Sequence, residues 1–336
     1  PKDVDTLVLD ELAVYRNNSQ RSKVCKVVAA DMRWVWGMTG SPMPTSPTDV
    51  WGQASIVTPS TVPKYFSHFR DRLMLRVTQF KWVPKTDAVE TAFRALTPAV
   101  RFTLDEVVEL PPVVRRTIKV PMGPKQEKAY TKLRTVCHAM IENHEITAAN
   151  AGAALSKLLQ VSLGWVYNSE GKTLALDNTA RIEAMLEVIM DAERKVLVFA
   201  PYHHALNGVA KVLERENISF AKVSGNTHRK ERNEIFSVFQ NTEKYRVLAA
   251  HPQCLAHGVT LTAADTILWL GPITSLEIYD QANHRITRVG QKHKQQVIRF
   301  SGTQVEAGMY SLLDAKQTRQ DALLSMFADA TEDRHG

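Results

Sequence analysis

Two arginines lie three positions apart in the stretch QANHRITRVGQ, which covers residues 281–291. Residues with this spacing share one face of a helix, so Arg285 and Arg288 would point the same way. Two guanidinium groups on one face can bind a single phosphate, because each planar fork donates two parallel hydrogen bonds. A pair of surface arginines that only face water is the alternative. The rest of the chain decides between the two.

A pair of carboxylates, Asp10 and Glu11, directly follows the apolar run TLVL at residues 6–9. Such a run predicts a buried parallel strand, and ligands of parallel sheets collect at the carboxyl ends of the strands. One carboxylate at this position could hold Mg²⁺ while its neighbour polarises an attacking water. The same pair is also typical of a helix N-terminus, where acidic side chains interact well with the helix dipole.

The elements that would position these residues are most regular after residue 180. Apolar runs predict buried strands at 195–200, 219–225, 245–250, 265–271 and 295–301. Helical patterns alternate with them at 180–192, 203–217, 229–240, 275–290 and 306–327. Strands that alternate with helices of this length indicate an α/β fold with a parallel sheet.

The earlier part of the chain has a different character. A second short strand is expected at 34–38, followed by a region with few apolar runs, recurrent prolines, and helical patches at 125–145 and 148–162. We therefore predict four segments. They are the last strands of a first α/β domain (1–60), a mainly helical insertion (61–175), a nearly complete α/β domain (176–305) and a closing helix (306–336).

Composition excludes several classes of protein. The 336 residues are 44% hydrophobic and 23% charged, as in an ordinary globular protein, and the net charge of +7 weakly favours a polyanionic partner. Cys25, Cys137 and Cys254 are too far apart to suggest a zinc site or a disulfide framework. No apolar run reaches the roughly 18 residues of a membrane span, so we expect no membrane partner and a cytoplasmic location.

Several stretches, in order along the chain, resemble one family. Asp10-Glu11-Leu12-Ala13, Thr39-Gly40-Ser41-Pro42 and Asp49-Val50-Trp51 resemble motifs II and III of the Snf-type DNA translocases of helicase superfamily two. The stretch VRFTLDEVVELPPVVRRTIKVPMGPKQEKAY resembles the family's arginine and LPP passage. KVLVFA, KVSGNTHRKERNEIFSVFQ and HGVTLTAADTILWLGP resemble motifs IV, IVa and V, and QANHRITRVGQ resembles motif VI. Matches in this order are far more specific than any single one, and their style is that of a phage or bacterial member.

The resemblance implies tandem RecA-like domains, the first of them incomplete, with a helical insertion between them. It also implies a motor that couples hydrolysis of ATP, with Mg²⁺, to movement on double-stranded DNA. A strand-separating or annealing helicase could use the same core. A DNA-binding or interaction module that kept the fold and lost the chemistry is the alternative from a different class.

The family's functional residues transfer to matching positions. The catalytic residues implied are Asp10, Glu11, Gln281, Arg285 and Arg288, with Asp10 on the metal and the two arginines as fingers on the transferred phosphoryl group. The nucleotide would contact Asp10, Gly258, Gln281, Arg285 and Arg288. The DNA would contact Thr39, Gly40, Ser41, Gly225, Arg229, Thr260 and Lys292.

Four features depart from the family pattern. Ala13 replaces a His, Ser41 a Thr, and Thr260 an Asn. No GxxxxGK[ST] loop occurs, and the GKT at 171–173 is no substitute because Val166 stands where the first Gly should be. The chain also starts without Met, close to an apolar strand. We therefore expect a C-terminal part of a translocase that, alone, does not hydrolyse ATP.

Overall fold

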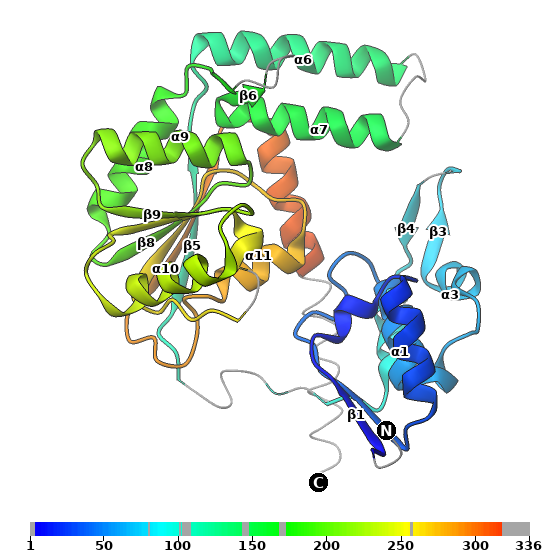
Figure 1. Cartoon of the computed structure of the whole chain (residues 1–336). Helices are drawn as coiled ribbons and strands as arrows, with labels where there is room; N and C mark the ends of the chain where they lie inside the picture. Colours follow the sequence, from blue (N-terminus) through cyan, green and yellow to red (C-terminus); the bar gives the residue numbers. More distant parts are fainter. Residues whose placement is uncertain are drawn as a thin grey trace. The chain divides into compact units, whose positions relative to one another are not determined.

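The computed structural model describes residues 4–79, 81–100, 102, 109–142, 148–167, 173–255 and 258–317. The chain forms two compact units (Figure 1). The first consists mainly of Pro1–Val107, and the second of Val108–Thr274 and Ile278–Leu312. Within the described residues, no helix is long and apolar enough to cross a membrane.

The first unit begins with two parallel strands, β1 (Thr6–Leu9) and β2 (Trp34–Gly37), joined through η1 (Leu12–Tyr15) and α1 (Gln20–Ala30). These strands agree with the two predicted from the sequence. The remaining elements are α2 (Asp49–Val57), η2 (Pro59–Thr61), α3 (Phe66–Leu73), the hairpin β3 (Met74–Arg76) and β4 (Trp82–Pro84), and α4 (Ala88–Leu96). Val50, Ala54, Phe69, Leu73 and Ala92 form a buried core among the helices.

The β1–β2 sheet and α1 leave large apolar side chains in solvent. Val8, Val27 and Trp36 are 57%, 69% and 62% exposed. A shallow groove of about 410 Å³ runs beside them, lined in part by Leu7, Leu9 and Val24. Exposed apolar surface on this scale is typical of a face that packs against something else.

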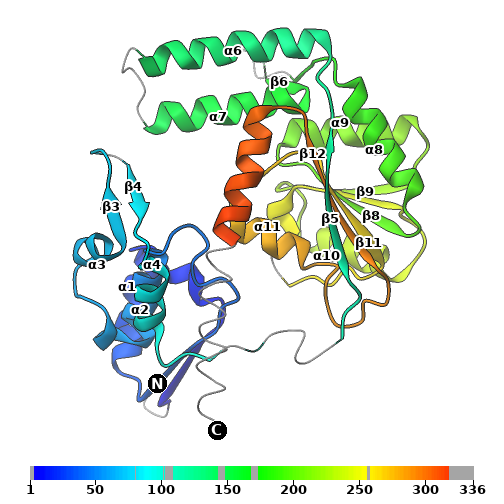
Figure 2. The same cartoon turned by 180° about the vertical axis from the view of Figure 1, so that it is seen from behind.

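The second unit is built on a six-stranded, all-parallel sheet with strand order β5-β12-β11-β8-β10-β9 (Figures 1 and 2). The strands are β5 (Val113–Lys119), β8 (Lys195–Phe199), β9 (Phe220–Val223), β10 (Val247–Ala250), β11 (Ala264–Trp269) and β12 (Gln295–Ser301). Strands β8, β10 and β11 are buried along their whole length. All five strands predicted after residue 180 are present.

Strand β5 differs from expectation, because it comes from the range predicted to be a mainly helical insertion. Its sequence, VVRRTIK, carries three cations and its side chains are largely exposed, so it lacks the apolar run of a central strand. It lies at the sheet edge and pairs only with β12 among the described strands. Charged side chains are a common way to protect such an edge from unwanted pairing.

Helices cover both faces of this sheet. Helices α8 (Thr179–Asp191) and α9 (His203–Arg215) bury Met185, Ile189, Leu206 and Val209 in the main core. In Figure 1, α10 (Arg229–Asn241) lies on the opposite side of the sheet from α9. This agrees with right-handed crossovers, because the chain moves along the sheet in opposite directions before and after β9.

A helical hairpin, α6 (Pro124–Glu142) and α7 (Ala148–Leu163), projects from the second unit, and its helices lie side by side in both views (Figures 1 and 2). Both were predicted as helical patches. The side-chain amide of Gln126 ties the two together, because its Nε2 donates to the carbonyl oxygens of Val161 at 2.8 Å and Ser162 at 2.7 Å. A short hairpin of β6 (Trp165–Tyr167) and β7 (Thr173–Ala175) follows α7.

The helix predicted at 275–290 is shorter than expected. Helix α11 (Leu276–Asn283) ends before both arginines, and residues 284–290 form turns. Ile286, Thr287 and Val289 are β-branched and lower the helix propensity there, and Gly290 has φ of 96°. Arg285 and Arg288 therefore do not share a helix face. The predicted closing helix runs over 304–317 in the described residues, and 318–327 lie outside them.

Candidate functional site

Asp10 and Glu11 lie at the carboxyl end of β1, next to the turn that follows β2. Main-chain bonds fix this arrangement: the amide of Met38 donates to the carbonyl of Leu9 at 2.8 Å, and the amide of Leu12 donates to that of Met38 at 2.7 Å. The hydroxyl of Thr39 lies 3.5 Å from Oε1 of Glu11. The structure thus brings together residues 28 positions apart, and the carboxylates sit where a parallel sheet places its ligands.

Glu11 has an unusual backbone conformation. Its φ of 54° and ψ of 56° lie in the left-handed region, and its amide donates to Oδ1 of Asp10 at 2.9 Å. A residue with a side chain costs on the order of 1 kcal/mol or more in that region, and such residues concentrate at functional sites. The left-handed conformation of Glu11 thus falls in the turn between β1 and η1, beside the two consecutive carboxylates.

The turn after β2 is held from both sides. The hydroxyl of Thr39 accepts from the amide of Ser41 at 3.2 Å, and Nε2 of buried Gln53 donates to the carbonyl of Pro42 at 2.6 Å. Gly40 has open space around it, whereas Ser41 is almost fully buried. Of the three residues of this turn predicted to contact DNA, Gly40 thus offers the freest approach to a ligand.

In the second unit, Arg285 links two segments from inside the fold. Its side chain is only 5% exposed. Its Nε donates to the carbonyl of Gln281 at 2.7 Å, and its Nη1 donates to that of Val259 at 3.2 Å. The backbone carbonyl of Arg285 accepts in turn from the amide of Leu261 at 2.9 Å. Arg285 therefore joins the end of α11 to the loop between β10 and β11.

Arg288 has a more open environment. Its Nη1 donates to the hydroxyl of Thr260 at 3.2 Å, a contact between exposed atoms. Gly258, two residues earlier, has φ of 66° and empty space where a side chain would be. The structure thus gathers Gly258, Thr260, Gln281, Arg285 and Arg288, but the two arginines differ: one is anchored to backbone and the other can reach a ligand.

Three side-chain hydrogen bonds, one buried and two part-buried, hold this region in place. The indole nitrogen of Trp269 on β11 donates to Oδ1 of Asn283 at the end of α11, at 2.9 Å. The hydroxyl of Thr287 donates to Oε1 of Gln295 at 2.6 Å, and Nε2 of Gln295 donates to the carbonyl of Pro111 at 3.3 Å. Pro111, just before β5, is thereby connected through Gln295 to the loop that carries Arg285 and Arg288. No local pattern could predict this link, because Gln295 and Pro111 are 184 positions apart.

Three of the four residues predicted to contact DNA in the second unit, Thr260 being the fourth, are divided between opposite edges of the sheet. Gly225 follows β9 and Arg229 begins α10, so both lie at the carboxyl edge. Lys292 precedes β12 and lies at the amino edge. One straight phosphate backbone along the carboxyl edge would not meet all three, so the set divides into two groups.

The carboxyl edge also holds two histidines, His203 at the start of α9 and His251 after β10. The rings of His203 and His251 stack with centroids 5.4 Å apart, and Nε2 of His251 lies 3.1 Å from the carbonyl of Pro201. Burial, with a further contribution from His203, lowers the pKa of His251. The pair adjoins Gly225, whose Cβ position would lie 3.7 Å from His203.

The donor set suits Mg²⁺ better than a protein-enclosed metal. Within the described residues, no group of three or more His, Cys, Asp or Glu side chains could hold a metal ion. Mg²⁺ usually binds one or two carboxylates together with water and the substrate's phosphates. Asp10 is an exposed carboxylate at a strand end, so it fits such a partial coordination shell.

Comparison with known proteins agrees with this architecture. Residues 2–167 match the SNF2-related domain, and residues 180–290 match the helicase conserved C-terminal domain. An uncharacterized ATP-dependent helicase of Mycoplasma pneumoniae is 26% identical over 88% of this chain and 28% of its own length. A SWI/SNF-related matrix-associated actin-dependent regulator of chromatin, subfamily A-like protein 1, of Xenopus tropicalis is 23% identical over 85% of this chain and 30% of its own length.

The fold is shared with a solved structure, the Sulfolobus solfataricus SWI2/SNF2 ATPase core in complex with double-stranded DNA. The TM-score is 0.51 at 20% identity, covering 97% of this chain and 70% of that one. The parallel sheets and the motif geometry define a tandem RecA-like protein of helicase superfamily two. More narrowly, the chain belongs to the SNF2-type family of that superfamily. It spans less than a third of the length of these two curated relatives.

Proposed function

We propose that this chain is part of an ATP-driven motor that moves along double-stranded DNA. Asp10 would hold Mg²⁺, which offsets charge on the phosphates of ATP, and Glu11 would polarise the attacking water. Arg288 would stabilise charge on the transferred phosphoryl group, an effect that exceeds about a thousandfold in rate in related chemistry. Gln281 and Gly258 would contact the nucleotide from the same region.

The observation that carries this proposal is the environment of Arg288. Its guanidinium is held by one weak contact, with the hydroxyl of Thr260, and can leave it without breaking a buried bond. Arg285 lies beneath, fixed to two backbone carbonyls. We therefore assign the finger role to Arg288 and give Arg285 the task of positioning the loop that carries it.

DNA contact would be made mainly to phosphates and would not depend on sequence. Thr39, Gly40 and Ser41 in the first unit and Gly225, Arg229 and Thr260 in the second would contribute. We also propose a location in a bacterial or host cytoplasm, where ATP and duplex DNA occur together.

The 336 residues contain no phosphate-cradling GxxxxGK[ST] loop. We therefore propose that they do not hydrolyse ATP by themselves. The competing proposal is a non-catalytic DNA-binding module, and it is favoured only if the complete protein also lacks hydrolysis.

The decisive experiment measures ATP hydrolysis by a protein in which these residues are joined to an upstream segment that carries the phosphate loop. The assay is run with and without duplex DNA, with Arg288→Ala as the test variant and Arg215→Ala, an exposed arginine on α9, as the matched control. Hydrolysis that duplex DNA stimulates, that Arg288→Ala abolishes and that Arg215→Ala retains supports the motor. Absence of hydrolysis in the complete protein, with DNA binding intact, supports the binding module.

A further inference from the structure

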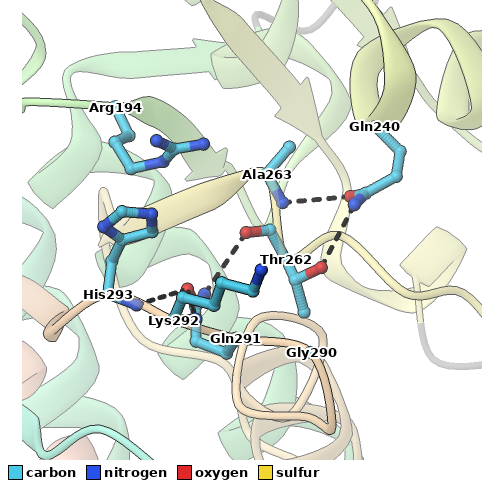
Figure 3. Close-up of a pocket in the computed structure, with 8 residues that line it drawn as sticks. All are labelled: Arg194, Gln240, Thr262, Ala263, Gly290, Gln291, Lys292 and His293. Carbon is cyan, nitrogen blue, oxygen red and sulfur yellow. Dashed lines mark hydrogen bonds between the residues drawn. The ribbon is translucent and has the colours of Figure 1, made fainter.

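A pocket at the amino edge of the second unit's sheet gathers positive charge (Figure 3). Its volume is about 210 Å³, and its lining residues come from the segments just before β8, β11 and β12 and from the end of α10. They are Arg194, Gln240, Thr262, Ala263, Gly290, Gln291, Lys292 and His293. Strands β12, β11 and β8 are consecutive in the sheet, which is why residues about 100 positions apart meet at their amino ends.

The framework of the pocket is fixed by two glutamines. Gln291 is 5% exposed, and its Nε2 donates to the carbonyls of Ala264 at 3.0 Å and Ile286 at 3.2 Å. Its Oε1 accepts from the amides of Lys292 at 3.0 Å and His293 at 3.1 Å. The side chain of Gln291 thus satisfies the backbone of the turn and leaves the two following side chains free to face the pocket.

Gln240 fixes the opposite wall. Its Oε1 accepts from the amide of Ala263 at 3.0 Å, and its Nε2 donates to the hydroxyl of Thr262 at 3.1 Å. Figure 3 shows both bonds, with the amine of Lys292 extending toward Thr262 and the guanidinium of Arg194 near the ring of His293. The polar walls therefore have their hydrogen bonds satisfied without using the cationic groups.

Two cationic side chains, Arg194 and Lys292, and the side chain of His293 line this pocket. Among the described residues, those of Arg194, Lys292 and His293 make no hydrogen bond or ion pair, and no carboxylate lines the pocket. Two cations and an imidazole that converge on one polar concavity with a neutral lining form a place where an anion gains charge-assisted hydrogen bonds at little cost in ordering.

We infer that this pocket binds a phosphate group, carried by the backbone of duplex DNA or by a free polyphosphate. Arg194 donates a fork of hydrogen bonds, Lys292 supplies a point charge, and His293 adds a ring nitrogen donor. The DNA form of the inference rests on the proposed function and adds a second contact, at the edge opposite Gly225. A phosphate bound there would be held by the same loop that carries Arg288, because Gly290 is only two residues further on.

The first test measures duplex binding by the 336-residue chain, from fluorescence anisotropy across a range of salt concentrations. Arg194→Ala and Lys292→Ala are each expected to weaken binding by roughly threefold to tenfold and to lower the salt slope by about one. The matched controls are Arg215→Ala and Lys211→Ala, which remove exposed cations from α9, and these should stay within about twofold. Hydrogen exchange of the β8 and β11 amides checks that each variant remains folded.

The second test separates the two sources of phosphate. Amide NMR signals of Lys292 and His293 are followed during additions of a short duplex and, separately, of inorganic pyrophosphate. Shifts with the duplex that Arg194→Ala abolishes assign the pocket to the DNA backbone. Shifts with pyrophosphate alone assign it to a free polyphosphate.

The inference is overturned if neither ligand moves these signals and both pocket variants bind DNA as the unaltered chain does. That outcome leaves the proposed function standing as long as the complete protein hydrolyses ATP when duplex DNA is added. Conversely, a pocket that binds phosphate in a protein without hydrolysis would overturn only the motor.

Discussion

The hydroxyl of Thr260 accepts a hydrogen bond from Nη1 of Arg288 at 3.2 Å, and the loop that carries Thr260 is tied to Arg285 one residue earlier, through the carbonyl of Val259. The two arginines therefore bond to the same loop at different acceptors: Arg288 at a side-chain hydroxyl and Arg285 at a backbone carbonyl. One contact is to a side chain on the surface and can exchange, whereas the other is to buried backbone and cannot do so without cost.

The two arginines should respond differently to removal. Arg288→Ala is expected to lower ATP hydrolysis by the complete protein by about a thousandfold, with little change in stability, because its side chain packs on the surface. Arg285→Ala should lower hydrolysis and also destabilise the second unit by roughly 2–4 kcal/mol, because a buried side chain is lost and two part-buried carbonyls lose their donor. Steady-state kinetics and urea unfolding separate the two effects. Equal losses of stability in both variants would contradict this division of roles.

Thr260→Val removes the resting partner of Arg288 and keeps the shape of the side chain. We expect folding stability to change by less than about 1 kcal/mol, because the lost bond is exposed. Hydrolysis should change by less than about tenfold, since the arginine remains free to reach the nucleotide. A loss as large as that of Arg288→Ala would mean that the Thr260 hydroxyl itself takes part in the reaction.

Glu11 offers a test of strain at the site. Glu11→Gly removes the cost of a left-handed residue with a side chain and should stabilise the first unit by about 1 kcal/mol. It should also abolish hydrolysis in the complete protein. Thermal unfolding and an ATPase assay provide the comparison, and Glu11→Gln, which keeps the strain, is the control. Destabilisation by glycine would show that the carboxylate's contacts outweigh its backbone cost.

A buried ion pair connects the last described helix, over 304–317, to α8. Arg181 and Glu306 are 3% and 0% exposed with Nη2 and Oε1 2.9 Å apart, and Oε2 of Glu306 accepts from the amide of Thr303 at 3.1 Å. Arg181→Met should cost roughly 3–5 kcal/mol, because it leaves a buried carboxylate without its partner. Arg94→Met, which removes an exposed partner of Glu90, should cost less than about 1 kcal/mol. Urea unfolding followed by hydrogen exchange of β8 amides measures both, and similar costs would contradict the prediction.

Acid should weaken the second unit through three histidines. Burial is the main cause that lowers the pKa of His204, His251 and His284. Below about pH 6.5 the unfolded chain therefore binds more protons than the folded chain. The free energy of unfolding is highest above that pH and falls as the pH drops below it. His204→Phe keeps an aromatic ring that cannot be protonated, and it should flatten this dependence in urea titrations between pH 5 and 8. An unchanged slope would exclude His204 as a source.

Strands and helices could be predicted from the sequence where the pattern that defines them lies within one segment. The strands at 195–199 and 264–269 overlap the apolar runs VLVFA (196–200) and ILWL (267–270), so burial on both faces could be predicted from the sequence alone. Strand β5 could not, because a charged edge strand resembles a loop. The end of α11 was predicted too late in the chain for another reason. The sequence keeps a helical spacing up to Gly290, but the turn before β12 is held by Gln291, which bonds to the carbonyls of Thr262 and Ala264.

The candidate site shows the same division. Asp10, Glu11, Arg285 and Arg288 follow from motif spacing, which is local. The different burial of the two arginines, and the meeting of Arg194 with Lys292, depend on strand order, which no local pattern encodes. Side chains that act through distant partners, such as Gln295 with Pro111, are invisible to a motif for that reason.

The pairing of β5 with β12 joins Val113 to Gln295 and Lys119 to Ser301, so it connects the first and last strands of the second unit. During synthesis at about 5–20 residues per second, β5 leaves the ribosome roughly ten seconds or more before its only described neighbour exists. In that interval the segment carries three cations, Arg115, Arg116 and Lys119. We expect the cations at the edge of the finished sheet also to disfavour pairing of the nascent segment with a wrong strand.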